Sequence, residues 1–266
     1  MNKRLGQHFL INKSAIKKII AALDLQKNET VIEIGPGEGA LTLPLLEERE
    51  KLNCKIIGIE KDQQLAKKLG SNIKLPISNF QIIEGDALKI LPPIIHNSSF
   101  MIQNYKIIGN IPYYITGKLL RIISELELKP ALTVLMIQKE VAERVSAKPP
   151  KMNLLAAATQ IWAEPKILFS LKPRDFNPPP KVDSTVIRLK PHTITDNQET
   201  IISYYKMIKV IFKQPRKTLL NNLTTGLKIP KNGIEKILGS LKIDPNARPQ
   251  DLSLEKLKEL TGVINS

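Results

Sequence analysis

Val31-Ile32-Glu33-Ile34-Gly35-Pro36-Gly37-Glu38-Gly39 is the stretch of the sequence that decides the fold. Its first half has the β-branched character of a buried strand, and its second half carries glycine at every other position. Glycine lets the chain turn sharply after the strand and lets a ligand approach the backbone closely. The stretch predicts a strand, a ligand-binding turn and a following helix, with a purely structural turn as the alternative.

Strand-like and helix-like segments alternate on either side of this turn. Strands are predicted at 31–34, 55–59, 80–83, 105–108 and 132–137, and helices at 40–52, 63–69 and 116–128. Such alternation is typical of an α/β fold with a doubly wound parallel sheet. Before it, Ser14 is placed to cap a helix. After it come helical stretches at 140–145 and 153–162. The strands 166–171 and 182–189 then predict an antiparallel hairpin at the sheet edge.

The C-terminal part of the chain has only helical patterns, at 201–212, 216–223, 233–241 and 254–260. The segment 190–198 is polar, contains Pro191 and has the composition of a linker. We therefore expect two domains, an α/β domain over residues 1–190 and a small all-helical domain over residues 199–266.

Charge and composition restrict the classes of function that this chain can have. The chain has 266 residues with 42% hydrophobic residues, 40 Lys+Arg and 25 Asp+Glu, a net charge of +15. Residues 31–138 carry a net +1, so the remainder carries +14. This split predicts a small-molecule site in the neutral block and a polyanion-binding surface elsewhere, with a merely lysine-rich composition as the alternative. One cysteine and three scattered histidines predict no metal site, and no apolar run is long enough to span a membrane. No signal peptide is recognisable, and a reducing cytosol fits the cysteine content.

Two acidic residues are placed to bind an adenosine-containing cofactor. Glu60 ends the second predicted strand, where a carboxylate can bind both hydroxyls of a ribose. Asp86 follows the third strand, where it can accept a hydrogen bond from an adenine amine, although Asp is also a common helix cap. An exposed carboxylate at a strand end is the alternative for Glu60.

Asn110-Ile111-Pro112-Tyr113-Tyr114 follows the fourth predicted strand and indicates the chemistry. The lone pair of an exocyclic aromatic amine is delocalised into the ring, so the nitrogen is a poor nucleophile. The Asn110 side-chain oxygen and the Ile111 carbonyl can accept its two N–H groups and favour tetrahedral nitrogen. Tyr113 offers a face on which a flipped base can stack. An ordinary Asn-Pro turn is the alternative.

Phe176 begins a second aromatic motif, Phe176-Asn177-Pro178-Pro179-Pro180-Lys181-Val182-Asp183-Ser184. Three consecutive prolines stiffen the loop and hold the ring with little entropy left to lose. Phe176 is therefore a candidate second stacking surface opposite Tyr113. A phenylalanine packed in the core is the alternative.

With these motifs in place, the sequence resembles the small-subunit ribosomal RNA adenine N6,N6-dimethyltransferase family over nearly its whole length. Leu5-Gly6-Gln7-His8-Phe9-Leu10, Gln138-Lys139-Glu140-Val141 and Arg216-Lys217-Thr218 also match it. His8 and Tyr114 depart from it, because asparagine is commoner at both positions.

The resemblance implies a Rossmann-like S-adenosylmethionine-dependent methyltransferase domain with a helical C-terminal domain. It implies cofactor contacts at His8, Leu10, Gly35, Glu60, Asp86 and Asn110. With the motifs above, we expect Gly37 to contact the cofactor as well, and we expect catalytic roles for Asn110, Tyr113 and Phe176. The implied reaction places two methyl groups on N6 of each of two adjacent adenosines in a hairpin near the 3′ end of small-subunit rRNA. The implied partner is the immature small ribosomal subunit, and we expect a monomeric, cytoplasmic protein.

Three alternatives stay open. The large-subunit rRNA methyltransferases of macrolide resistance share the sequence of the Asn110–Tyr113 motif. The glycine loop and the triple proline, however, are more similar to those of the small-subunit group. A nicotinamide dehydrogenase has no use for the Asn110 motif. A non-catalytic assembly factor would present the same basic surface.

Overall fold

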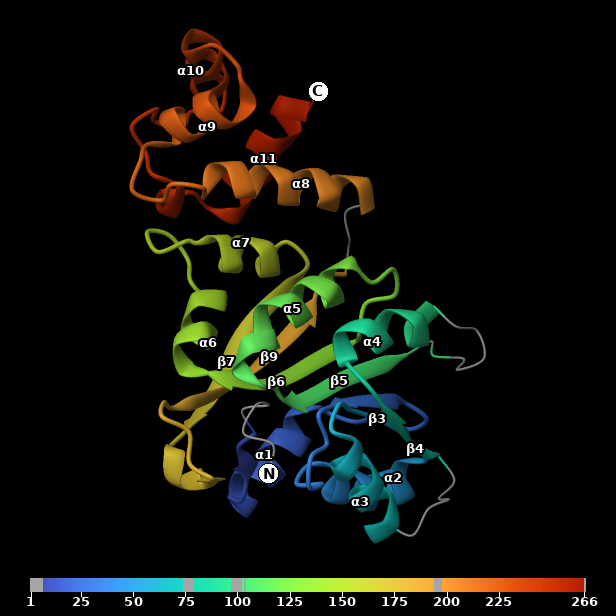
Figure 1. The fold of residues 1–266 in the computed structure, drawn as a ribbon. Helices are drawn as coiled ribbons and strands as arrows, with labels where there is room; N and C mark the ends of the chain where they lie inside the picture. The colour runs from blue at the N-terminus through green and yellow to red at the C-terminus, as the bar shows by residue number, and fades with distance from the viewer. Residues whose placement is uncertain (1–6, 74–78, 97–101, 103, 194–197, 266) are drawn as a thin grey trace. The chain divides into compact units, whose positions relative to one another are not determined.

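The structure is a computed structural model that describes residues 7–73, 79–96, 102, 104–193 and 198–265 (Figure 1). The chain divides into two compact units, residues 1–142 with 165–191, and residues 143–164 with 192–266. Each unit is described by itself below.

The first unit is built on a seven-stranded sheet with the order β4-β3-β2-β5-β6-β9-β7. The strands are β2 (Thr30–Ile34), β3 (Lys55–Glu60), β4 (Phe80–Glu84), β5 (Tyr105–Asn110), β6 (Leu132–Gln138), β7 (Ala163–Leu171) and β9 (Ser184–Pro191). The first five pair in parallel, and β9 runs antiparallel to β6. The predicted parallel sheet is confirmed, and the two closing strands lie side by side at one edge.

Helices connect these strands. They are α1 (Lys13–Ala22), α2 (Thr42–Leu52), α3 (Gln63–Asn72), α4 (Ala87–His96), α5 (Thr116–Glu125) and α6 (Lys139–Val145) (Figure 1). The central strands β2 and β5 are almost entirely buried, as their continuous apolar runs require in a covered parallel sheet. Because parallel strands alternate with helices, the carboxyl ends of β2 to β5 all open at one edge.

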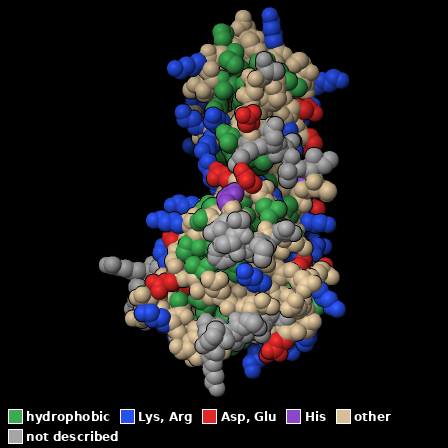
Figure 2. Space-filling model, turned by 90° about the vertical axis from the view of Figure 1, so that its right-hand side faces the viewer, with side chains coloured by type: hydrophobic (Ala, Val, Ile, Leu, Met, Phe, Trp, Pro, Cys, Tyr) green, Lys and Arg blue, Asp and Glu red, His purple; other side chains and the backbone are tan. Residues whose placement is uncertain are grey.

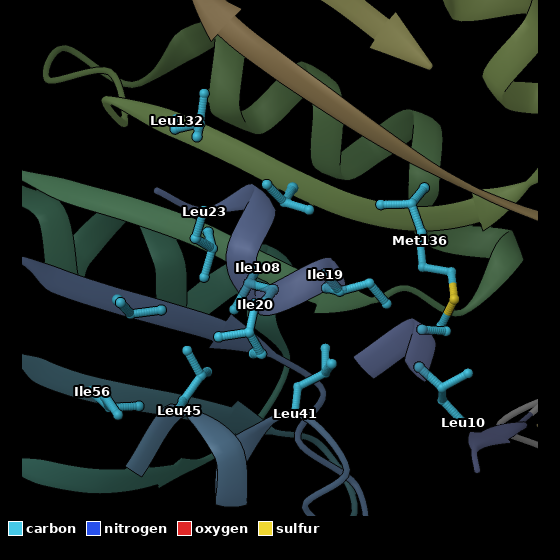
Figure 3. Packing of buried hydrophobic residues seen from close by; sticks show 14 of the residues in the cluster. Leu10, Ile19, Ile20, Leu23, Leu41, Leu45, Ile56, Ile108, Leu132 and Met136 are labelled. Atoms are coloured by element: carbon cyan, nitrogen blue, oxygen red, sulfur yellow. The ribbon is translucent and has the colours of Figure 1, made fainter. Parts of the chain in front are cut away.

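A hydrophobic cluster joins α1 and α2 to this sheet. Ile19 and Ile20 of α1 and Leu23, which follows the helix, belong to one cluster with Ile108 and Leu45, and Figure 3 shows Ile20 next to Ile108. Each of these side chains is less than a tenth exposed, and full burial of such a side chain contributes about 1.5–3 kcal/mol. The cluster holds α1 in place, and with it the segment that leads into α1.

Three local features differ from the sequence-based expectations. Asn12, not Ser14, caps α1, because its side-chain oxygen accepts the Ala15 amide at 3.0 Å and Ser14 already lies inside the helix. Helix α4 was not predicted, since it contains Pro92 and Pro93, residues that normally end a helix. A short ladder pairs β1 (Phe9–Leu10) with β8 (Phe176–Asn177), two strands too short to show a periodicity.

The second unit is helical, as the sequence predicts. Its helices are α7 (Leu154–Gln160), α8 (Gln198–Ile211), α9 (Leu219–Leu227), α10 (Lys231–Ser240) and α11 (Leu254–Asn265). Tyr204 and Tyr205 of α8 donate hydrogen bonds to carbonyls of α7, at 3.3 and 2.8 Å. This packing groups residues 143–164 with the C-terminal helices, whereas the expected boundary assigned them to the α/β domain.

Two predicted segments lie partly outside the residues that the structure describes. The predicted linker 190–198 includes residues 194–197, which lie outside them, and so do Leu5 and Gly6 of the N-terminal motif. Among the helices that the structure describes, none is long and apolar enough to cross a membrane.

Candidate active site

A cavity opens at the carboxyl ends of β2, β3, β4 and β5. It is lined by residues 7–10, 33–37, 59–61, 85–87 and 110–115, with Ala40 and Leu41. This is the edge at which open α/β sheets bind their ligands. The glycine loop, the strand-end acids and the Asn110 motif, which are far apart in the sequence, therefore share one site.

The glycine loop forms a cradle on one side of the cavity. Gly35 and Gly37 have φ angles of +68° and +59°, which L-residues with a side chain rarely adopt. A Cβ added to Gly35 would meet only the Asn110 carbonyl oxygen, at 4.0 Å, so a side chain there would take up cavity space. Gly35 thus leaves room for a ligand against the backbone, whereas at Gly37 the Phe9 ring lies 3.0 Å from where a Cβ would be.

Glu60 is fixed at the end of β3. Its two carboxylate oxygens accept hydrogen bonds from the Gly37 and Asp62 amides, each at 2.8 Å, and the residue is 5% exposed. A carboxylate oxygen can accept more than one hydrogen bond, so these contacts orient the group and leave it acceptor capacity. The arrangement suits the binding of a ribose diol.

Asp86 both caps α4 and lines the cavity, so the two roles considered for it are compatible. Its Oδ1 accepts the Leu88 amide at 3.0 Å, and its Oδ2 accepts the Lys61 ammonium at 2.9 Å. The bond from Lys61 is the main reason why the pKa of Asp86 lies below its usual range. Asp86 therefore presents an acceptor to the cavity.

Asn110 ends β5 with its amide held in one orientation. Its Nδ2 donates to the His8 carbonyl oxygen at 2.7 Å. No described residue donates to Oδ1, so the acceptor end of the amide is available to a ligand. The prediction that Asn110 offers an oxygen at this point agrees with this geometry.

Tyr113 stands next to Asn110 on the cavity wall. Its hydroxyl is 3.0 Å from the Ser184 hydroxyl, and its ring stacks on His8 with centroids 6.2 Å apart. Burial raises the pKa of Tyr113, so the phenol stays protonated at neutral pH. The neighbouring Tyr114 is 58% exposed at the rim.

The N-terminal segment covers the cavity from another side. His8 is tied to the proline-rich loop by a hydrogen bond of 2.8 Å between its Nδ1 and the Pro178 carbonyl oxygen. Leu10 lines the cavity and pairs with Phe176 across the ladder of β1 and β8. The structure therefore brings His8 and Leu10 to the same cavity as Gly35, Gly37, Glu60, Asp86, Asn110 and Tyr113.

Phe176 is not brought to this cavity. It is 4% exposed, belongs to the hydrophobic cluster and is not part of the cavity lining. Its ring is packed in the core because β8 turns it toward Leu10 and the apolar side chains around it. The expected stacking surface opposite Tyr113 is absent from the described cavity lining, and the core alternative describes Phe176 in this structure.

The predicted site did not include two charged residues of the lining, Glu33 and Lys61. Glu33 is 1% exposed and accepts the Thr42 hydroxyl at 2.8 Å, and burial raises its pKa to about 7. An acid inside an apolar strand was the available signal, because such groups are rarely buried without a role. Lys61 carried no signal, since a lysine after a strand is ordinarily solvated.

The lining fits S-adenosylmethionine. That molecule presents a positive sulfonium and ammonium, a ribose diol and an adenine amine, which are cationic or hydrogen-bond donors. The cavity offers the carboxylates of Glu33, Glu60 and Asp86, the Asn110 oxygen and the space above Gly35. Among the described residues no group of three or more His, Cys, Asp or Glu could hold a metal ion.

Curated proteins similar in sequence to this chain include methyltransferases of ribosomal RNA. Residues 1–265 match the family model described as ribosomal RNA adenine dimethylase. The ribosomal RNA small subunit methyltransferase A of Dehalococcoides mccartyi strain CBDB1 is 39% identical over 259 residues, which cover 97% of this chain and 86% of the relative. The protein of that name from Clostridium botulinum strain Okra is 37% identical over 273 residues, covering 99% and 94%.

Solved structures share the fold. A dimethyladenosine transferase from Plasmodium falciparum superposes with a TM-score of 0.79 at 25% identity, covering 97% of this chain and 98% of that one. The 23S rRNA methyltransferase ErmE gives a TM-score of 0.74 at 23% identity, covering 97% and 100%, and supports the fold alone. The predicted Rossmann-like methyltransferase fold is confirmed. The chain belongs to the ribosomal RNA adenine dimethylase family, a family of S-adenosylmethionine-dependent methyltransferases.

Proposed function

We propose that this chain methylates N6 of two adjacent adenosines in the 3′-terminal hairpin of 16S rRNA, on the immature small ribosomal subunit. The observation that carries the proposal is the amide of Asn110, which lines the same cavity as Glu60 and Asp86. Its nitrogen is held by the His8 carbonyl, and its oxygen accepts no bond from a described residue.

The chemistry required of the protein is the activation of an exocyclic amine. Bound S-adenosylmethionine supplies a methyl group on a sulfonium, which is open to direct displacement. Asn110 Oδ1 accepts one N–H of the adenine amine, and this interaction strengthens as the nitrogen becomes positive during attack. The bond from Nδ2 to the His8 carbonyl prevents the amide from turning its donor end toward the amine.

Tyr113 positions the base. Its hydroxyl is held by Ser184 and its ring by contact with His8, so the ring has little freedom to lose when a flipped adenine stacks on it. Stacking of a base on an aromatic side chain contributes about 1–3 kcal/mol. Tyr113 is not needed as a base, since methylation acidifies the amine and lets the proton leave to water.

Catalysis then rests mainly on orientation, which can lower a barrier by about 7–11 kcal/mol. Each group that does the orienting is itself held: Asn110 by His8, Glu60 by two backbone amides, and Tyr113 by Ser184.

The basic charge supports RNA as the substrate. We assign methyl transfer to the α/β domain, residues 1–190, and part of the RNA-backbone binding to the helical domain, residues 199–266. Residues 201–266 contain 12 basic and 5 acidic residues. On the face in Figure 2, Lys and Arg side chains are scattered over both units. We further propose that the protein acts as a monomer in the cytoplasm, which is consistent with its single, free cysteine.

The test uses tritiated S-adenosylmethionine and small subunits from cells that lack this modification. The expected product is N6,N6-dimethyladenosine at two adjacent positions near the 3′ end of 16S rRNA, with no label in already methylated subunits. Label in large-subunit rRNA would support the macrolide-resistance alternative instead. Binding of small subunits without incorporation would support the assembly-factor alternative. Binding of NAD in place of the cofactor would favour a dehydrogenase.

A further inference from the structure

Lys61 lines the cavity, and the proposed reaction gives it no role. It follows Glu60 at the end of β3, and its side chain is half exposed. An exposed lysine normally points into solvent, yet this one turns to the cavity and donates to Asp86 Oδ2 at 2.9 Å.

Each carboxylate oxygen of Asp86 has its own hydrogen-bond donor. The Leu88 amide of α4 donates to Oδ1, and Lys61 donates to Oδ2. With only the amide, the carboxylate would be free to rotate about its bond to the chain. With both donors its plane is set, and the remaining lone pairs have fixed directions.

We propose that Lys61 is a positioning residue that holds Asp86 for the adenine amine of the cofactor and thereby gives the site its preference for adenine. The inference rests on the proposed function, in which this cavity binds S-adenosylmethionine. It makes one short segment responsible for two contacts, since Glu60 serves the ribose and its neighbour Lys61 orients the acceptor for the base.

The chemistry predicts selectivity against hypoxanthine. An ionised carboxylate only accepts hydrogen bonds, so it matches the adenine N6 amine and repels the carbonyl oxygen that hypoxanthine has at that position. A carboxylate with a set direction discriminates between the two, whereas one that can turn away discriminates less.

The test measures binding of S-adenosylhomocysteine and S-inosylhomocysteine to the full chain by calorimetry, without RNA. Lys61→Met should lower the affinity for S-adenosylhomocysteine by about 5-fold and change the affinity for S-inosylhomocysteine little. The ratio of the two affinities therefore falls. Lys61→Arg should restore most of the ratio. Lys89→Met is the matched control. The Lys89 backbone N–H donates to the Asp86 carbonyl oxygen at 2.8 Å, a bond that the substitution keeps, whereas its side chain acts on the Asp86 carboxylate only through its charge and forms no described bond to it.

A pH series separates positioning from a structural role. The charged groups near Asp86 are Glu60 at the end of β3, Lys61 directly after it, Glu84 at the end of β4 and Lys89 of α4. The Tyr114 phenol lies near Lys61. Lys61 lowers the pKa of Asp86, so without it Asp86 takes up a proton at a higher pH. Affinity for S-adenosylhomocysteine should therefore begin to fall at a higher pH in Lys61→Met than in the unsubstituted protein.

A double-mutant cycle completes the test. In an Asp86→Ala background, Lys61→Met should cause no further loss of affinity. The proposal is wrong if Lys61→Met leaves the affinity ratio unchanged or binds S-adenosylhomocysteine more tightly. It is also wrong if Lys61→Met lowers the affinity in the Asp86→Ala background as much as it does alone. An unsubstituted protein that prefers the adenine analogue but does not methylate rRNA refutes the proposed reaction and leaves the role of Lys61 standing.

Discussion

Replacing Glu60 by glutamine tests the ribose contact, and the structure sets the size of two separate effects. Both carboxylate oxygens accept backbone amides, Gly37 and Asp62, at 2.8 Å. Glutamine has one acceptor oxygen, so its NH2 group must face one of these N–H groups. A buried donor left without an acceptor costs about 1–3 kcal/mol, and we expect the free energy of unfolding of Glu60→Gln to fall by that amount.

Cofactor binding should fall further. The carboxylate accepts both ribose hydroxyls in the proposed complex, and hydrogen bonds to a charged group contribute about 1.5–3 kcal/mol. The affinity for S-adenosylhomocysteine should therefore drop by roughly 10- to 100-fold.

Calorimetry measures the affinity and urea unfolding measures the stability. Glu84→Gln is the matched control, because Glu84 is the partner of Glu60 in the register of β3 and β4 but is exposed. We expect the control to change neither quantity measurably. Unchanged affinity in Glu60→Gln, with the lower stability observed, would remove Glu60 from the ribose site.

Three further predictions concern catalysis, protonation and RNA binding. Asn110→Ala should slow single-turnover methylation by about 100-fold or more and weaken cofactor binding far less, because its contact grows in the transition state; a near-normal rate would refute the mechanism. Glu33 has its pKa raised from 4.5 to about 7, so its protonated form favours the folded state. Relative to Glu33→Gln, the unsubstituted protein should lose up to roughly 3 kcal/mol of unfolding free energy as the pH rises from 4.5 to 7. Urea unfolding at a series of pH values measures this. If the unfolding free energies of the two proteins changed equally with pH, the prediction would be wrong. Replacing the exposed Arg216 and Lys217 by glutamine should lower the slope of log affinity for rRNA against log salt by about 2, and an unchanged slope would exclude them as phosphate contacts.

Much of the fold was predictable because its strands are continuous apolar runs and its turns carry glycine. Val31–Gly39 predicts both β2 and the cradle, and strand ends in a parallel sheet converge at one edge, so Glu60, Asp86 and Asn110 could be brought together without coordinates. Their convergence follows from topology alone.

The remaining features depend on contacts between distant segments. Phe176 has the same local sequence whether it lines the cavity or packs in the core, and its pairing with Leu10 decides between them. Lys61 becomes part of the site only because Asp86 lies within 2.9 Å of it. Arg216 and Lys217 were expected to begin a helix, but Thr218 caps α9 and both precede it.

The ladder of β1 with β8 has a consequence for when the enzyme becomes active during its synthesis. His8 and Pro178, the ends of the bond beside this ladder, are 170 residues apart in the sequence. Once synthesis of the chain has gone beyond Asn110, the glycine loop, Glu60 and Asp86 are all present. Strand β8, which pairs with β1 and holds the N-terminal segment at the cavity, has not yet been synthesised. The cavity wall that is translated first is thus the last to close. A truncated chain that ends before residue 176 should be unable to turn over cofactor, which ties methyl transfer to synthesis of the α/β domain almost to its end.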